Sequence, residues 1–427
     1  MSSRHPISSA DAAWLRMDRA TNLMVINALI AFDERPDWER LRARFVARIV
    51  ERFPRFGCVA RGGHWEPAAT FAPADHFHHV ALPAGVELRE LISDLVTAPL
   101  DHDRPLWEVH QIDVPDAGGA LLVRVHHAVG DGVSLARVLL SASDDGDPDG
   151  PGFGAGAEHS EGLLRAGLSL LAHPRRAIGD VGTLAKLLSP WGEGSRVLKG
   201  DGRVGHRVAW SRPVALWRVK RIARAYQVTV NDVLMAALAG ALRARIVAGG
   251  SAPERLHALV PLNLRPLDAP LPADLGNRFG LVLADLPVEL DAQIERLWEV
   301  NRRMDAIKRS DEGAITFAIL EAMGRAPAGV ESRLLEFFTA KASLVVTNVI
   351  GPPRPISLAG APVASVLVWA PCAGDMRMTV SLFSYRGRVT AGFLADAGIV
   401  GDPQPLADAF RAELLALARR ARRVALA

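Results

Sequence analysis

The sequence predicts an α/β protein with mixed sheets, divided into two domains. A chain of 427 residues exceeds the size, roughly 250–300 residues, at which single hydrophobic cores stop growing. Segments of helical and of strand periodicity alternate in both halves of the chain. The stretch between the halves is crowded with Gly, Pro and Asp, which is typical of loops and linkers. We therefore expect a first domain over residues 1–150, a linker with crossover helices over 151–205, and a second domain over 206–427.

The first domain is expected to combine helices with strands. Apolar residues at helical spacing predict helices over 37–52 and 88–96. Two apolar runs, 106–114 and 120–125, predict strands separated by a turn that contains Pro, Asp and Gly. A further helix is expected over 133–140. The second strand therefore leads into a helix through a short connection, and that connection carries the most distinctive residues of the chain.

The second half resumes the same mixture. Helices are predicted over 163–188, 214–226 and 230–247, and Asn231 is a candidate N-cap for the third. The chain closes with an amphipathic helix over 405–425, whose last turns are strongly basic. The predicted strands are 256–261, 281–286, 342–349, 378–384 and 389–394. The last two strands flank a short turn with Gly, which predicts a hairpin.

Composition and charge exclude several classes of protein. The formal net charge is only +3, so the chain as a whole lacks the basic excess that nucleic-acid binding requires. Two distant cysteines, Cys58 and Cys372, form neither a disulfide framework nor a Cys-based zinc site, which favours a cytoplasmic location. The N-terminus has no apolar signal core, and no run of about 18 uncharged apolar residues occurs. Any membrane contact is therefore expected to be peripheral.

The connection after the second strand is His126-His127-Ala128-Val129-Gly130-Asp131-Gly132, an HHxxxDG pattern. Alternation along a strand sends His126 and His127 to opposite faces, so one imidazole can reach a cleft while the other packs inside. An imidazole suits general base catalysis because its pKa lies near the operating pH. Asp131 is expected to hold the turn or to orient the ring, and Gly132 to permit a backbone conformation or close packing that a Cβ would block. The pattern predicts acyl transfer with His127 as general base.

Other catalytic and cofactor sites have weaker support. A GxSxG elbow is absent, so an acyl-serine mechanism lacks its usual marker. The cluster His76, His78 and His79 could suggest a metal site, but no carboxylate or Cys group at ligand spacing supports it, and we expect no metal. Neither a Walker loop nor a dinucleotide fingerprint occurs, and no cofactor is expected.

Ordered blocks of the chain resemble those of the bacterial bifunctional wax ester synthase/diacylglycerol acyltransferase family, within the CoA-dependent acyltransferases. The resemblance spans most of the sequence. HHxxxDG alone is shared with other acyl-CoA-dependent and peptide-condensing enzymes, whereas the ordered set is far more specific. The blocks are Asp11–Leu15, Pro99–Glu108, His126–Gly132, Val230–Val233, Pro261–Arg265, Gly276–Arg278 and Thr347–Pro352.

This resemblance implies two domains like those of chloramphenicol acetyltransferase, with the active site in a channel between them. It implies acyl-CoA as donor substrate and diacylglycerol or a long-chain alcohol as acceptor, giving triacylglycerol or wax ester. By the same resemblance His127 is the base, Asp131 is mainly structural, and Asn231 and Asp232 begin a helix near the active site. Asn231 is also the best candidate to donate a hydrogen bond to the oxyanion. The basic C-terminal helix is a candidate for contact with the inner membrane or a lipid droplet.

Two alternatives remain open from the sequence. The first is a condensation or polyketide-associated acyltransferase that takes its acyl group from a carrier protein, since such enzymes share HHxxxDG. The second is a non-catalytic lipid-binding or droplet-associated protein, against which the intact histidine motif argues because a binder needs no base. Acyl chain length, acceptor preference, substrate-binding residues and oligomeric state cannot be assigned from these patterns.

Overall fold

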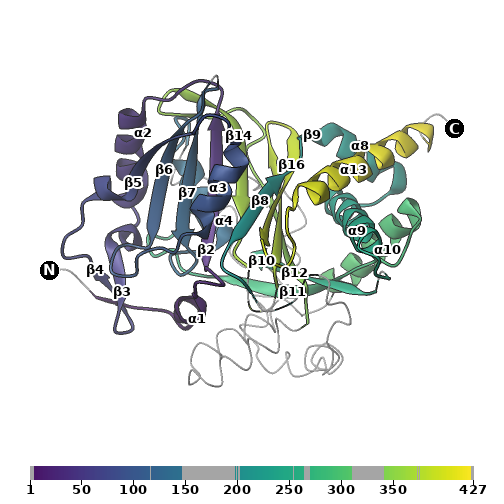
Figure 1. Ribbon diagram of the computed structural model, residues 1–427, viewed down its shortest axis with the longest axis horizontal. Helices are drawn as coiled ribbons and strands as arrows, with labels where there is room; N and C mark the ends of the chain where they lie inside the picture. The colour runs from purple at the N-terminus through teal and green to yellow at the C-terminus, as the bar shows by residue number, and fades with distance from the viewer. Residues whose placement is uncertain are drawn as a thin grey trace.

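The computed structural model describes residues 4–424 except 116, 147–197, 199, 201, 253, 264–269, 310–340, 373 and 375. Its described strands form two large sheets and one small sheet. The two large sheets lie in adjacent lobes, the first dominated by the N-terminal third and the second by the C-terminal half (Figure 1). Both large sheets contain parallel and antiparallel pairs, which confirms the predicted class of mixed α/β structure.

The first large sheet carries the histidine motif at the end of a central strand. In spatial order its strands are β13 (Ser357–Leu358), β14 (Ala361–Trp369), β2 (Val25–Phe32), β7 (Gly119–His126), β6 (Trp107–Asp113) and β5 (Phe77–Ala81). One face packs against α2 (Trp38–Phe45), the following π-helical turn (Val46–Val50) and α4 (Gly132–Ser141). The other face packs against α3 (Leu88–Thr97). The predicted helices and strands of this domain are confirmed.

Two strands of this sheet come from the C-terminal half of the chain. β14 pairs antiparallel with β2 over most of its length, and β13 extends the sheet beyond it. The residues expected to belong to the second domain, 206–427, therefore supply one edge of the first sheet. Neither β2 nor β14 is among the predicted strands, although both are long apolar runs.

The second large sheet is covered by a layer of helices. Its order is β11 (Phe279–Leu286), β10 (Leu256–Asn263), β12 (Leu344–Ile350), β15 (Met378–Tyr385), β16 (Arg388–Asp396) and β8 (His206–Trp210), with β9 (Val214–Ala215) also pairing with β16. The covering helices are α8 (Leu216–Tyr226), α9 (Val230–Ala248), α10 (Gln293–Lys308) and α13 (Gln404–Val424). α9 is buried along most of its length, since Ala and Leu dominate its body and it packs against the other three helices. The five predicted strands and the terminal helix are confirmed.

Local chemistry explains two connections in this lobe. The hairpin between β15 and β16 turns on Arg386 and Gly387, which both have positive φ, as a two-residue type I′ turn requires. α9 is capped by Thr229, whose hydroxyl accepts from the amide of Asp232 while the Asp232 carboxylate accepts from the amide of Thr229. The prediction that Asn231 caps this helix is therefore wrong, because the capping box begins two residues earlier.

The remaining described elements complete the first lobe. A small sheet joins β1 (His5–Pro6), β4 (His64–Pro67) and β3 (Cys58–Arg61), and short 3₁₀ turns occupy Pro54–Gly57 and Pro73–His76. α1 (Ser9–Met17) lies below the first sheet, on the side facing the second lobe (Figure 1). Cys58 and Cys372 are both free and buried. The helices predicted over 163–188 lie outside the described residues, as does most of the predicted linker.

Candidate active site

The histidine motif sits where β7 ends and α4 begins. The amide of His126 donates to the carbonyl of Leu106 and that of His127 to the carbonyl of Met24, so strand pairing continues to the motif itself. His126 is fully buried, whereas 7% of the surface of His127 is exposed to solvent. The two rings contact different neighbours, as predicted from strand alternation: His126 faces Asp18, and His127 faces residues of α1 and of the second half of the chain.

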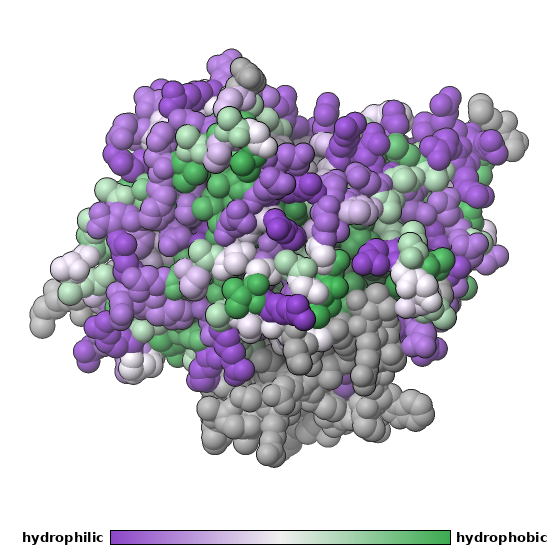
Figure 2. All heavy atoms as spheres, viewed as in Figure 1, coloured by the Kyte–Doolittle hydropathy of each residue, from purple (hydrophilic) through white to green (hydrophobic). Residues whose placement is uncertain are grey.

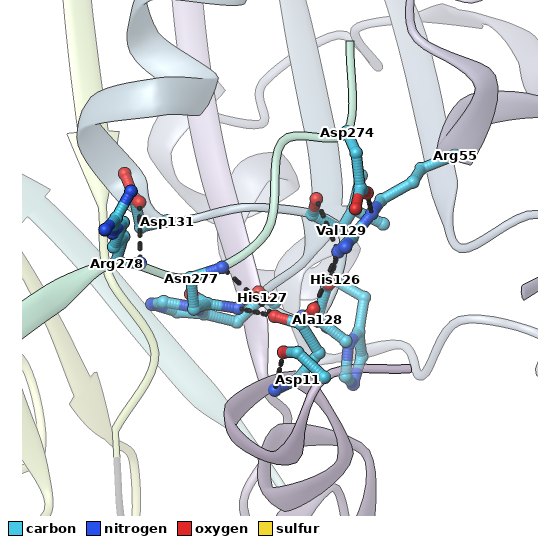
Figure 3. Close-up of polar contacts among 11 residues, drawn as sticks. Asp11, Arg55, His126, His127, Ala128, Val129, Asp131, Asp274, Asn277 and Arg278 are labelled. Carbon is cyan, nitrogen blue, oxygen red and sulfur yellow. Dashed lines mark hydrogen bonds and ion pairs between the residues drawn. The ribbon is translucent and has the colours of Figure 1, made fainter. Parts of the chain in front are cut away.

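The His127 imidazole is held on its flat face and on one edge. The indole of Trp14, from α1, stacks on it with a centroid distance of 4.0 Å and an interplanar angle of 13°. Phe279, at the start of β11, lies 5.7 Å away at a tilt. On the ring edge, Nδ1 lies 2.9 Å from Oδ1 of Asn277. Residues from both halves of the chain therefore surround this ring, and Figure 3 shows its far end pointing away from α1.

Asn277 connects His127 to a buried carboxylate. Its Nδ2 donates to Oδ1 of Asp11 at 2.7 Å and to the carbonyl of His127 at 2.7 Å, and its backbone amide also donates to Asp11. Asp11 lies in the first turn of α1 and is completely buried. Gly276 precedes Asn277 with φ +54°, a left-handed conformation that favours glycine. A Cβ there would also lie 3.3 Å from the guanidinium of Arg55.

Arg55 completes this cluster (Figure 3). Its Nη1 donates to Oδ2 of Asp11 at 2.9 Å and to the carbonyl of Ala128 at 2.9 Å, and its Nε pairs with Asp274. The guanidinium also lies over the ring of the buried Trp65. Because Arg55 is 4% exposed and Asp11 is 0% exposed, their pairing is needed to keep both charges inside the protein.

Burial sets the charge of His127. The loss of solvent lowers its pKa to about 4, although Asp131, the carbonyl of His127 itself and Asn277 each favour the charged form. The imidazole is therefore neutral at neutral pH and can accept a proton. The hydrogen-bond partner of Nδ1 is the neutral amide of Asn277, not a carboxylate that would raise the pKa of the ring.

Asp131 holds the turn rather than the ring. It is the N-cap of α4, where Oδ1 accepts from the amide of Ser134 at 2.8 Å and Oδ2 accepts from the amide of Arg278 at 3.2 Å. The expectation for Gly132 is wrong, since its φ is not in the left-handed region and a Cβ would meet nothing within 4 Å. Gly132 is simply the first helical residue after the cap. The glycine of this site that does need its conformation is Gly276.

Asn231 and Asp232 lie at the edge of the second sheet, at the start of α9. Nδ2 of Asn348, near the end of β12, donates to Oδ1 of Asn231 at 3.0 Å. Asp232 is buried and structural, since it closes the capping box and accepts from Nδ2 of Asn301 at 2.9 Å. β12 runs parallel to β10, whose last residue pairs with Phe279. The end of β12 that carries Asn348 therefore lies at the same edge of the sheet as Phe279.

His126 belongs to a separate cluster with Asp18 and His102. Oδ2 of Asp18 lies 2.8 Å from Nε2 of His102 and 3.6 Å from Nε2 of His126, a grouping compact enough for a metal ion. Nδ1 of His126 accepts from the amide of Ala128 at 3.0 Å. Nε2 of His102 is hydrogen-bonded to Asp18, whereas Nε2 of His126 faces the same carboxylate at 3.6 Å, beyond hydrogen-bond distance.

Charge in this second cluster follows from its hydrogen bonds. Burial would raise the pKa of Asp18, but the hydrogen bond to His102 and the nearby imidazole of His126 hold it well below its usual value. The same bond raises the pKa of His102, which is half exposed. Asp18 therefore anchors the end of α1 through an ion pair, while Asp11 anchors its beginning.

The histidines at 76–79 do not converge. Nδ1 of His76 lies 2.7 Å from the carbonyl of Trp107, on whose ring it stacks. His78 lies against His110, and His79 faces Asp113. These rings have separate structural contacts.

The sequence patterns do not predict a functional role for three residues of the site, namely Asp11, Arg55 and Asn277. Asp11 and Asn277 fall within family-like blocks, but nothing in their local pattern assigns them a role. Arg55 follows Pro54 in an ordinary polar stretch. The sequence feature that could best have indicated this group is the pair Gly276-Asn277, because a glycine allows the backbone to turn and so to aim the following side chain at His127.

Comparisons with known proteins identify the family of this chain. Residues 7–189 match the wax ester synthase/diacylglycerol acyltransferase catalytic domain, and residues 275–418 match the WS/DGAT C-terminal domain. A Mycobacterium tuberculosis protein named as a probable diacylglycerol O-acyltransferase is 28% identical over 97% of this chain and 96% of its own length.

Solved structures with the same fold include both acyltransferases and domains of peptide synthetases. The wax ester synthase/diacylglycerol acyltransferase from Marinobacter aquaeolei VT8 superposes with a TM-score of 0.72 at 23% identity, covering 98% of this chain and 100% of that one. The first condensation domain of the calcium-dependent antibiotic synthetase gives a TM-score of 0.63 at 16% identity, covering 98% and 96%. The fold alone therefore does not separate acyl transfer from peptide condensation, whereas the matched domains do.

Proposed function

Because the chain belongs to the wax ester synthase/diacylglycerol acyltransferase family, we propose that it moves a long-chain acyl group from acyl-CoA to diacylglycerol or a long-chain alcohol, with His127 as general base. The observation that carries the proposal is the neutral His127 ring, held by Trp14 and Asn277 between the two halves of the chain. The products are triacylglycerol or wax ester. Acyl-CoA is a substrate, and no cofactor takes part.

The reaction proceeds by direct transfer. Nε2 of His127 takes the proton of the acceptor hydroxyl as its oxygen attacks the thioester carbonyl. The tetrahedral intermediate collapses by breaking the carbon–sulfur bond, and the imidazolium returns the proton to the CoA thiolate. The pKa of about 4 keeps His127 neutral before the reaction, and it also makes the imidazolium a strong acid toward that thiolate.

The oxyanion needs a hydrogen-bond donor at about 3 Å. Asn231 is our candidate. Its Oδ1 is occupied by Asn348, which leaves the Nδ2 of Asn231 to donate. We expect Asn231→Ala to lower kcat with little change in KM, and an unchanged kcat would remove Asn231 from this role.

Thin-layer chromatography tests the activity. The protein is incubated with palmitoyl-CoA and either hexadecanol or diolein, and ester formation is compared with that of His127→Ala. General base catalysis is typically worth about 10²–10⁴-fold, so the variant should lose at least about a hundredfold. Folding of the variant is checked by thermal melting. Near-normal ester formation by a folded His127→Ala protein would refute the role of His127.

The same assay addresses the two alternatives. Palmitoyl groups are offered either on CoA or on an acyl carrier protein, and a carrier-dependent enzyme would use only the second. A non-catalytic lipid-binding protein would form no ester from either donor. We expect ester from acyl-CoA.

We also propose that the protein works on the cytoplasmic side of a membrane or at a lipid droplet. Among the described helices none is both long and apolar enough to span a bilayer. The adjacent helices α8 and α13 (Figure 1) instead carry many basic side chains, and two of them, Arg218 and Arg221, lie over the exposed indole of Trp217. Hydrophilic side chains dominate this part of the face seen in Figure 2. The basic side chains are Arg218, Lys220, Arg221, Arg224, Arg419, Arg420, Arg422 and Arg423.

Vesicle sedimentation tests this surface. We expect binding to phosphatidylglycerol vesicles but not to phosphatidylcholine vesicles, and binding should weaken with salt because the charges are exposed. Arg422→Glu with Arg423→Glu should reduce it. The matched control is Arg40→Glu with Arg61→Glu, two exposed arginines of the first lobe. Equal binding by both double variants would refute the α8–α13 surface.

A further inference from the structure

We propose that Asn277, Asp11 and Arg55 form a buried relay that positions His127 and fixes which of its nitrogens carries the proton. This inference rests on the proposed role of His127 as base. The HHxxxDG pattern suggests that Asp131 orients the ring of His127. We assign that role instead to the side-chain amide of Asn277, from the second half of the chain.

The hydrogen bonds of Asn277 determine the tautomer of His127. Nδ2 of Asn277 lies 2.7 Å from a carboxylate oxygen of Asp11 and 2.7 Å from the carbonyl of His127. Both of these oxygens can only accept, so the amide must present both of its hydrogens to them. The Asn277 atom next to His127 is then Oδ1, which also can only accept. Nδ1 of His127 must therefore donate, and the neutral ring keeps its lone pair on Nε2, the atom that takes the substrate proton.

Asp11 and Arg55 keep the amide of Asn277 in this orientation. Asp11 accepts from both the backbone amide and Nδ2 of Asn277 through one oxygen, while Arg55 occupies the other oxygen at 2.9 Å. Arg55 pairs with Asp11 inside the protein, where neither side chain is more than 4% exposed, and this pairing fixes the position of the carboxylate that orients the amide. Arg55 also donates to the carbonyl of Ala128, which ties the relay to the loop that follows His127.

Asp131 is committed elsewhere. Its Oδ1 accepts from the first turn of α4, and its Oδ2 accepts from the amide of Arg278. It still favours the charged form of His127 through space. Its contribution to the proton transfer is therefore electrostatic, while the directional contact on Nδ1 belongs to Asn277.

A neutral amide next to Nδ1 has a chemical consequence. A carboxylate in that place would stabilise the imidazolium strongly and raise the pKa of the ring. The relay keeps its negative charge one residue further away, on Asp11, and offsets it with Arg55. His127 is thus oriented as in a catalytic triad while remaining uncharged over a wide pH range.

Two variants with a matched control test the relay. Asn277→Ala removes the contact on Nδ1. The double variant Asp11→Asn with Asn277→Asp keeps a side-chain donor facing a side-chain acceptor between the two positions, and it places the carboxylate directly on Nδ1. It gives up the bonds to the backbone amide of residue 277 and to the carbonyl of His127, so its activity is compared with that of Asn277→Ala. The control is Asn27→Ala, because Asn27 is also a buried amide, bonded to Arg124 and to the carbonyl of Val25, and does not contact His127. Folding of each protein is checked by thermal melting.

The relay predicts a distinct result for each protein. Asn277→Ala should lower kcat at least about tenfold with little change in KM, since general base catalysis as a whole is worth about 10²–10⁴-fold. The double variant should retain more activity at pH 8 than Asn277→Ala. It should lose that activity as the pH falls toward 5, where the wild-type protein stays active, because the adjacent carboxylate raises the pKa of His127. Asn27→Ala should keep the wild-type kcat and pH profile.

A spectroscopic measurement separates the relay from the proposed function. Nitrogen-15 spectra of histidine-labelled protein distinguish the two neutral tautomers, and the His127 signal is identified by its loss in His127→Gln. We expect the proton on Nδ1, whether or not the protein transfers acyl groups. A proton on Nε2 in the wild-type protein would overturn the relay, as would wild-type kcat in Asn277→Ala or an unshifted pH profile in the folded double variant. Absence of ester formation by the wild-type protein would overturn the proposed function instead.

Discussion

Trp14 is expected to support the charged state of His127 during the reaction. The indole lies parallel to the imidazole at 4.0 Å, so the imidazolium that forms when Nε2 takes a proton lies directly over an aromatic face. Such cation–π contacts are worth about 0.5–2 kcal/mol. Since about 1.4 kcal/mol changes a rate tenfold, removing the indole should slow acyl transfer by about 2- to 30-fold.

The choice of replacement separates the aromatic face from simple burial. Trp14→Leu keeps an apolar side chain against the imidazole and limits the entry of water, so the loss should appear in kcat, because the cation exists only after substrate has bound. Trp14→Phe keeps an aromatic face and should lose less. The control is Trp298→Leu, since Trp298 lies exposed on α10 in the second lobe.

Initial rates with palmitoyl-CoA and diolein, measured between pH 3 and 8 so that the range includes the His127 pKa of about 4, check this prediction. The acid limb of the profile should move to lower pH in Trp14→Leu, because the imidazolium has lost a stabilising contact. An unchanged kcat in Trp14→Leu, or an equal loss in Trp14→Phe, would refute the reasoning.

Three further predictions concern the frame of the site. Asp131→Ala should destabilise the protein by about 0.5–2 kcal/mol in urea unfolding. Asp131→Asn, which keeps the cap on Ser134 but loses the acceptor for the amide of Arg278, should cost less, and equal losses would contradict the capping role. Gly276→Ala should lower both stability and activity because of its φ of +54°, while Gly132→Ala should leave thermal stability unchanged, and the reverse order would be inconsistent with the structure. Asp18→Asn should destabilise the protein more at pH 6 than at pH 9. The Asp18–His102 ion pair stabilises the protein fully between the ordinary carboxyl pKa of 3.8 and the ordinary imidazole pKa of 6.5. This stabilisation is lost as the pH rises through the raised pKa of His102. Urea unfolding at both pH values measures the effect, and an equal loss of stability at pH 6 and pH 9 would argue against it.

Local patterns were sufficient for most of the helices and strands. The strand and helix on either side of HHxxxDG follow from apolar spacing, and the β15–β16 hairpin follows from the residues of its turn. The edge formed by β13 and β14 does not, because its pairing with β2 joins segments near opposite ends of the chain. An apolar run can indicate a strand, but it does not indicate which other strand pairs with it.

The site divides in the same way. His127 is recognisable because its neighbours in sequence carry the motif, and the structural role of Asp131 follows from its place before a helix. Asp11, Arg55 and Asn277 come together only in the folded protein, where burial turns three ordinary polar residues into a connected group. Asp11 reads locally as a common acid in a first helical turn. Its contact with Asn277 requires both halves of the chain to be in place.

The edge that residues 357–369 add to the first sheet has a consequence for synthesis. β2 and β7 leave the ribosome early, but the outer side of β2 has no partner until β14 follows, near the end of the 427-residue chain. At roughly 5–20 residues per second, that edge waits for tens of seconds with its amides and carbonyls unpaired. A gene fragment ending between the two lobes would leave the same edge open permanently. The histidine motif thus sits in a sheet that translation completes almost last, and the two lobes cannot be made as independent pieces.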